Sequence, residues 1–138
     1  PFRNPANSNP KARVQSFTVT TLLPSTDAAS AAFYAAAFWT APAKCVVDSV
    51  SARWNTASTS GTVTVHKVPS GTAPDSGTAL LSSTIDTSGT ADTNTAGTLS
   101  TTAATLELAA GDSLQLVDGG TLTSLVDLEV TVGLHWIA

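Results

Sequence analysis

Side chains that commonly bind metals or act as nucleophiles are few and widely spaced in this sequence. The residues best suited to hold zinc or to assist nucleophilic catalysis are His66, His135 and Cys45. No two of them stand at a C-x-x-C or H-x-x-x-H spacing, and both histidines fall on the outward faces of predicted strands. We therefore expect surface or interface histidines, no metal site and no cofactor.

One serine has the sequence context of a hydrolase nucleophile. The string Gly111-Asp112-Ser113-Leu114 spells the nucleophile motif of the GDSL esterases and lipases. Those enzymes place the motif near the start of an α/β fold and supply the base from a late Asp-x-x-His, which neither histidine here matches. A serine nucleophile needs that base and the group that orients it. A plain Gly-Asp turn explains the string, and we expect that the protein is not an enzyme.

Acidic residues suggest two further hypotheses. Asp127 and Glu129 share the outward face of a predicted strand, and glycoside hydrolysis uses two carboxyl groups that converge in three dimensions. Asp86, Asp92 and Asn94 offer oxygen ligands for Ca²⁺, but the EF-hand and Gly-rich calcium-repeat spacings are missing. We favour a solvated strand face for the first pair and turn solvation for the second group.

The tryptophans, with Tyr34, are the residues that would stack on sugar rings, as in carbohydrate-binding β-sandwiches. Trp54 and Trp136 continue apolar strand faces, so we expect them to pack in the core. Trp39 is the freest of the three. It is the candidate aromatic for a glycan or for a protein interface.

The charge of the chain is divided between its first residues and the rest. Residues 1–13 hold three of the six Lys and Arg and no acid, whereas the remaining residues hold three bases and all ten acids. The net charge of −4 argues against nucleic acid as a partner, because phosphate binding needs a basic face.

Residues 1–15 are predicted to form an extended N-terminal arm, since Pro1, Pro5 and Pro10 favour extended backbone. Ordering such a segment costs on the order of 1–2 kcal/mol per residue. Three surface charge pairs at roughly 0–1 kcal/mol each do not offset that cost. Order must therefore come from a sizeable contact with a partner, with another subunit or with the surface of residues 16–138 of the same chain. The candidate contact residues are Phe2, Arg3, Asn4, Lys11 and Arg13.

Residues 16–138 are predicted to form one domain with its own core. Charged residues make up only 12% of the chain, while Thr, Ser and Ala dominate, which suits β-structure. No apolar run approaches the roughly 20 residues that span a bilayer, and no signal peptide opens the sequence, so we expect no membrane partner. Cys45 has no possible disulfide partner within the chain, so stability must come from packing or assembly.

Alternation of apolar and polar residues predicts about eight short strands. The clearest lies over residues 126–136, where six apolar residues recur at every second position. Residues 17–23, 44–55 and 61–69 show the same period, and residues 78–86 show it weakly. Asp48 falls on the predicted buried face of its strand and would need a partner there.

Two connections and one segment complete the predicted topology. Leu106 and Leu108 lead through a short Gly-containing turn to Leu114 and Leu116, which predicts a hairpin, and Asp118-Gly119-Gly120 predicts a turn.

Residues 27–39 are rich in Ala, the strongest helix former, and Ser25 or Thr26 would cap a helix there. We favour a strand over residues 33–40, because Pro42 follows at once. Regularly spaced short strands predict an all-β fold, an antiparallel β-sandwich or jelly roll with an extended N-terminal arm.

The sequence also resembles a known family over roughly residues 30–138. The segments that carry the resemblance are FWTAPAKCVVDSV at 38–50, TVTVH at 62–66, LAAGDSLQL at 108–116 and VTVGL at 130–134. In the spacing of their strands and the placement of their turns, they are similar to the small jelly-roll capsid decoration (cement) proteins of tailed bacteriophages. A helix at residues 28–39 would depart from that family.

The resemblance implies a virion structural protein on the capsid exterior that binds and stabilises the phage head. It also implies a homotrimer seated between capsomers of the major capsid protein, with the arm residues contacting an acidic or polar groove there, and no catalytic residues. The alternative is a carbohydrate-binding β-sandwich module displayed on a virion or another assembly. That alternative rests on Trp39 and on the lightly charged, Thr-rich surface.

Overall fold

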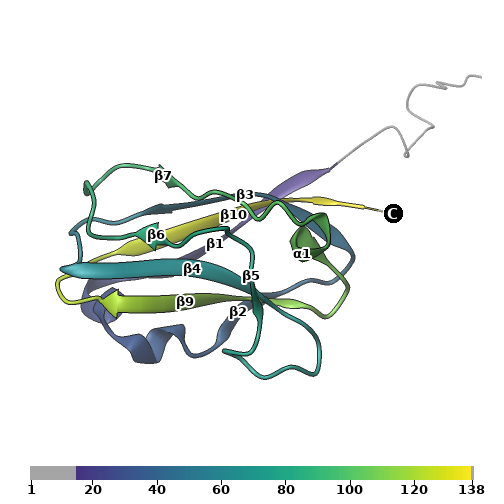
Figure 1. The fold of residues 1–138 in the computed structure, drawn as a ribbon, viewed down its shortest axis with the longest axis horizontal. Helices are drawn as coiled ribbons and strands as arrows, with labels where there is room; N and C mark the ends of the chain where they lie inside the picture. Colours follow the sequence, from purple (N-terminus) through teal and green to yellow (C-terminus); the bar gives the residue numbers. More distant parts are fainter. Residues whose placement is uncertain (1–14, 138) are drawn as a thin grey trace, which may run out of the picture.

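The computed structural model describes residues 15–137, which form two antiparallel five-stranded sheets packed face to face (Figure 1). Sheet A has the order β1-β10-β3-β7, with β8 also beside β3. Sheet B has the order β2-β9-β4-β5, with β6 also beside β4. The main strands are β1 (Ser16–Leu23), β2 (Ala37–Thr40), β3 (Cys45–Arg53), β4 (Ser60–Val68), β9 (Ser113–Thr121) and β10 (Leu128–Trp136). The predicted all-β sandwich is confirmed.

The remaining elements are short. Two 3₁₀ helices, η2 (Ser25–Ala29) and η3 (Ala31–Tyr34), precede β2, and a four-residue helix α1 (Ala103–Leu106) precedes β8. The two-residue strands are β5 (Thr78–Ala79), β6 (Ile85–Asp86), β7 (Thr95–Ala96) and β8 (Glu107–Leu108). Residues 15–137 therefore form ten strands where about eight were predicted, because strands of two residues leave no periodic signal. Within residues 15–137 no helix has the length and apolar character to cross a bilayer.

The core lies between the sheets and is built by residues at alternate positions of the long strands. β10 contributes Leu128, Val130, Val132 and Leu134, each at most 1% exposed. Burying an aliphatic side chain of this size contributes about 1.5–3 kcal/mol. Trp54, 1% exposed, lies in the same core, which confirms its predicted role.

A β-bulge in β3 places Asp48 on the outside of the sandwich. Gly133 pairs with Ser49 and the next residue, Leu134, pairs with Val47, so Asp48 is the extra residue between them. Val47 is buried while Asp48 and Ser49 are exposed. The prediction that Asp48 falls on the buried face is wrong, because a strict period of two assumes a strand without a bulge.

The predicted hairpin over residues 106–116 is also wrong. β8 pairs with β3 in sheet A, whereas β9 pairs with β2 and β4 in sheet B, so the turn between them crosses from one sheet to the other. The turn itself is present: the Asp112 N–H donates to the Ala109 carbonyl at 3.0 Å, and Gly111 has φ +93°. Apolar alternation indicates which face of a strand is buried and carries no information on its pairing partner.

Gly119 and Gly120 lie inside β9, opposite β4, and do not form the predicted turn. A Cβ on Gly120 would lie 2.3 Å from the Ser60 carbonyl oxygen, and the residue has φ +63°. These glycines serve the close approach of two strands, a use that the sequence does not distinguish from a turn.

The Ala-rich segment forms neither a regular helix nor the full predicted strand. Only Ala37–Thr40 is strand, and the residues before it form η2 and η3. Tyr34, 2% exposed, anchors both by donating its hydroxyl hydrogen to the Ala28 carbonyl at 2.6 Å. Burial, with a smaller effect of the Asp118 charge, raises the pKa of Tyr34, so the hydroxyl stays a donor.

The close approach of Gly120 to the Ser60 backbone predicts how a side chain at this position would change stability. Gly120→Ala should lower the free energy of unfolding by about 2–3 kcal/mol or more, because it adds a backbone clash to the positive φ. Gly71→Ala is the matched control: its φ is +87°, nothing lies within 4 Å of the new Cβ, and we expect a loss of about 1 kcal/mol. Urea unfolding of both variants measures the difference, and equal losses would contradict the role given to Gly120.

Candidate functional site

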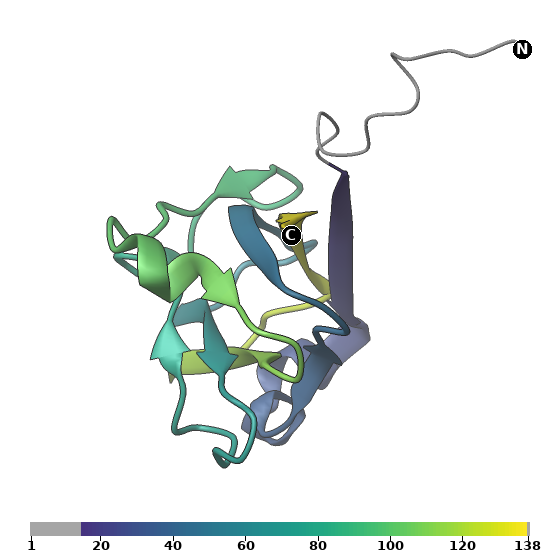
Figure 2. The same ribbon diagram turned by 90° about the vertical axis from the view of Figure 1, so that its right-hand side faces the viewer.

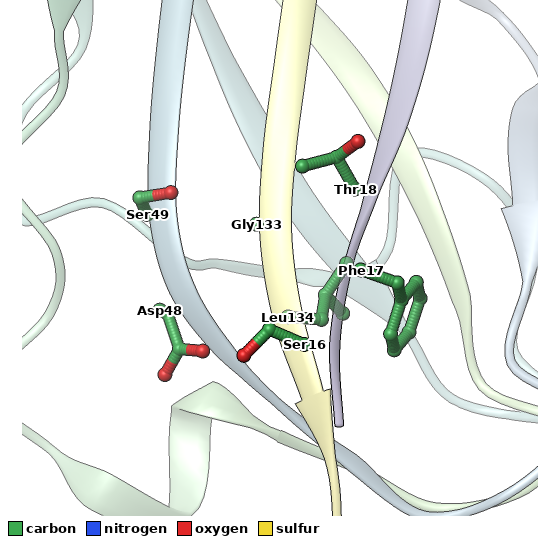
Figure 3. A pocket seen from close by; sticks show the side chains of 7 residues that line it. All are labelled: Ser16, Phe17, Thr18, Asp48, Ser49, Gly133 and Leu134. Carbon is green, nitrogen blue, oxygen red and sulfur yellow. The ribbon is translucent and has the colours of Figure 1, made fainter. Parts of the chain in front are cut away.

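An open groove of about 420 Å³ crosses the outer face of sheet A (Figure 3). Strands β1, β10 and β3 line it with Ser16, Phe17, Thr18, Asp48, Ser49, Gly133 and Leu134. Gly133 leaves the middle of the groove without a side chain, and a Cβ there would lie 2.5 Å from Ser49 Oγ. The groove therefore depends on a glycine in the central strand opposite the bulge.

The bulge brings a carboxylate to this groove and a histidine holds it. Nδ1 of His135 lies 2.9 Å and 2.8 Å from the two carboxylate oxygens of Asp48. The Asp48 side chain is 47% exposed and that of His135 25%, so the pair contributes at most roughly 1 kcal/mol to stability. Its main effect is to orient the Asp48 carboxylate beside the groove.

Serine, histidine and aspartate stand on three adjacent strands here. Ser16 pairs with His135 across β1 and β10, and Asp48 contacts His135 from the other side. Within residues 15–137, no hydrogen bond joins His135 to Ser16 or to Ser49. The arrangement offers hydroxyls and a carboxylate for hydrogen bonding to a ligand.

Three aromatic side chains, here called the aromatic seam, lie where the sheet edges formed by β1 and β2 meet. Phe17 of β1 stacks on Trp136 of β10 with ring centroids 4.2 Å apart and planes at 16°. Phe17 also approaches Trp39 of β2 at 5.8 Å and 51°. Each such pair contributes about 0.5–1.5 kcal/mol beyond its buried area. Trp39 and Trp136 are both partly buried against the core, so Trp39 is less free than its sequence position suggests.

The five predicted arm contacts, from Phe2 to Arg13, lie outside the described residues. Cys45 is fully buried, and burial, with a smaller effect of the Asp112 charge, raises the pKa of its thiol. Asp112 and Ser113 organise the turn between β8 and β9. The Asp112 carboxylate accepts the Ala109 N–H at 2.9 Å, and Ser113 Oγ lies 2.8 Å from Thr40 Oγ1.

The acidic candidates take part in separate local contacts. Asp127 precedes β10, has φ +54° and accepts the Ser25 N–H, while Glu129 lies exposed within the strand. The prediction that the two share one strand face is wrong. Asp86 accepts the hydroxyl and the N–H of Ser88 at 2.6 Å and 2.8 Å, and these bonds lower the pKa of Asp86. Among residues 15–137 no three potential metal-ligating side chains cluster.

The sequence did not predict a polar cluster that lies on the outer face of sheet B. Gln115 is fully buried there, donating to the Tyr34 carbonyl at 2.9 Å and to Asp75 Oδ1 at 2.6 Å, and accepting the Asp75 N–H at 2.8 Å. His66, opposite Gln115 in the register, is partly buried, and its Nδ1 is buried with no partner among the described residues. Burial lowers the pKa of His66, and the Asp75 charge opposes that effect.

Sequence periodicity correctly placed His66 on the outer face of its strand. It gave no sign that another segment covers this face, because nothing in a strand pattern marks a distant loop that folds over it.

Comparisons with known proteins give a distant structural likeness. No family model matches the sequence, and no curated protein matches it. Among solved structures, the fold is similar to a chain of the structure described as "Cyanophage Pam1 capsid asymmetric unit". The TM-score is 0.45 and the identity 14%, over 90% of this chain and 85% of that one.

The lowered pKa of His66 predicts a pH dependence of stability. When the pH falls below about 6.5, the ordinary pKa of histidine, His66 of the unfolded chain takes up a proton that the folded chain resists. The free energy of unfolding therefore decreases as the pH decreases. His66→Gln should therefore lose less stability than the wild type between about pH 7.5 and pH 5.5. Urea unfolding at both pH values measures this, and equal losses in the two proteins would refute the assignment.

Proposed function

We propose that this chain is a virion structural protein, a decoration or cement protein on the exterior of a phage head. The observation that carries the proposal is the antiparallel sandwich of residues 15–137, which includes most of the segment whose spacing of strands and turns resembles the cement proteins. A structural, non-catalytic role also agrees with the contact of Ser113 to Thr40 and with the contact of Asp127 to the Ser25 N–H.

The proposed partner is the major capsid protein, and the mechanism is mass action. A protein that binds only the assembled shell stabilises it by RT ln(1 + [L]/Kd), about 2.7 kcal/mol at one hundred times Kd. Assembly as a homotrimer would add avidity to each contact. The basic first residues and the acidic remainder suit different surfaces, so Phe2, Arg3, Asn4, Lys11 and Arg13 are assigned to an acidic or polar groove of the shell.

Deleting residues 1–14 tests this assignment. Gln15 is kept because its carbonyl accepts the Trp136 N–H at 3.1 Å. We expect a folded β-protein by circular dichroism whose affinity for capsids that lack the protein falls at least about tenfold, a loss of 1.4 kcal/mol. Cosedimentation with such capsids measures the affinity.

Substitution separates charge from shape in the same assay. The triple change of Arg3, Lys11 and Arg13 to Ala should remove the salt-sensitive part of the affinity, since salt screens exposed charge pairs. Arg53→Ala, an exposed base within β3, is the control and should leave it unchanged. The cement role would fail if undecorated capsids resisted heat and low salt as well as decorated ones.

Binding of surface glycans is a second candidate function, and the groove on sheet A favours it. Hydroxyls of Ser16, Thr18 and Ser49 and the Asp48 carboxylate surround the open floor at Gly133, an arrangement suited to the hydroxyls of a sugar. The groove is a better glycan candidate than Trp39, because that ring is partly buried beside Phe17.

A glycan array tests this second function. If it is correct, the wild type binds and the double variant Thr18→Ala, Ser49→Ala binds about tenfold more weakly, since two hydrogen bonds contribute roughly 1–3 kcal/mol. Trp39→Phe, which keeps an aromatic ring in the seam, is the control and should retain binding. An array without any signal, together with tight capsid binding, would exclude the glycan function.

A further inference from the structure

β1 is the outermost strand of sheet A and has an unprotected edge (Figure 2). β10 pairs with all eight of its residues, and no strand within residues 15–137 pairs with its other side. Natural edge strands are usually blunted by charges, proline, bulges or short length. β1 reads SFTVTTLL and runs in unbroken register with β10, so it has none of these devices.

The direction of each backbone group along β1 follows from one hydrogen bond. The Trp136 N–H donates to the Gln15 carbonyl, which makes these two residues a hydrogen-bonded pair. Such pairs alternate along an antiparallel ladder. The residues whose N–H and C=O groups point away from β10, to the free edge, are therefore Ser16, Thr18, Thr20 and Leu22.

A side-chain contact agrees with this assignment. Thr20 and Thr131 are opposite each other, and their hydroxyl oxygens lie 3.2 Å apart. Side chains come closest in pairs that do not exchange backbone hydrogen bonds, as expected if the Thr20 backbone faces the free edge.

The side chains beside this edge carry no charge, and several of them are large and apolar. Leu22 is 55% exposed on the outer face of sheet A. On the inner face, Phe17 and Val19 are only partly buried, although they pack against the core. Phe17 also contacts Trp39 of β2, so the aromatic seam lies on the same side of the sandwich as the free edge.

We propose that β1 pairs edge to edge with β1 of a second copy of this chain, antiparallel and about a two-fold axis at Val19. In this register Thr18 lies opposite Thr20 of the second copy and Ser16 opposite its Leu22. All four edge residues then donate and accept backbone hydrogen bonds. The two copies of sheet A, with five strands each, become one continuous sheet.

A second copy is the occupant that this edge fits best. β1 carries no charge, so self-pairing sets no like charges opposite one another, even though the chain has a net charge of −4. The same two-fold axis places Val19 against its own copy and Phe17 beside Thr21 of the second copy, so partly covered apolar side chains of β1 gain contacts. The contact is isologous, unlike the interface of a trimer, so the inference goes beyond the proposed function and does not depend on it.

A single cysteine tests the register. Val19 would face its own copy across the axis in a pair without backbone hydrogen bonds, where Cα atoms lie about 4.5 Å apart, within disulfide range. Val19→Cys in the full chain should give a covalent dimer under mild oxidation on a non-reducing gel. The native Cys45 is fully buried and should not react.

Thr21→Cys is the matched control, because it lies on the same face of β1 but opposite Phe17 of the second copy. It should remain uncrosslinked. A monomeric Val19→Cys, or equal crosslinking of both variants, would overturn the proposal.

A backbone substitution tests the hydrogen bonds separately. Thr18→Pro removes an N–H that faces the free edge and leaves the bonds to β10 intact, a position at which sheets tolerate proline. Sedimentation of the full chain should show at least tenfold weaker two-fold association, whereas Thr18→Ala, which keeps the N–H, should associate like the wild type. Circular dichroism reports folding in both variants. Unchanged association of a folded Thr18→Pro would contradict β1 pairing.

Discussion

The pairing of β10 with β1 on one side and β3 on the other is the constraint on which the rest of the structure depends. β10 joins the outermost long strand of sheet A to the strand that carries β7 and β8, so sheet A cannot form without it. It also supplies four nearly inaccessible aliphatic side chains to the core. Because β10 lies near the end of the sequence, sheet A closes only after contacts that span more than 100 residues, a topology that folds slowly.

The same strand links the core to the outer surface through one residue. Gly133 allows Ser49 to approach, and the register shift beside it turns Asp48 out of the sandwich. Asp48 then contacts His135, two residues beyond Gly133. A side chain at position 133 would close the groove and press on Ser49, so the shape of this surface depends on Gly133.

Periodicity predicted four strands well because β3, β4 and β10 bury one face along most of their length and β1 half-buries one. It failed where a residue serves the geometry of a distant neighbour. Gly120 admits the Ser60 backbone, and the turn at Gly111 changes sheets, yet both resemble ordinary turns in sequence. The pairing of Asp48 with His135 joins residues 87 positions apart through a bulge, so no local pattern contains it.

A sandwich of two open sheets has edges, and this chain treats its edges differently. In sheet B, β4 is flanked by β9 on one side and by the short β5 and β6 on the other, and short strands offer little backbone to a partner. β1 presents eight uncharged residues beside a partly buried aromatic seam, immediately after the segment that holds half of the basic residues. A strand of this kind invites pairing wherever it is exposed, and the proposed two-fold pairing would cover that edge.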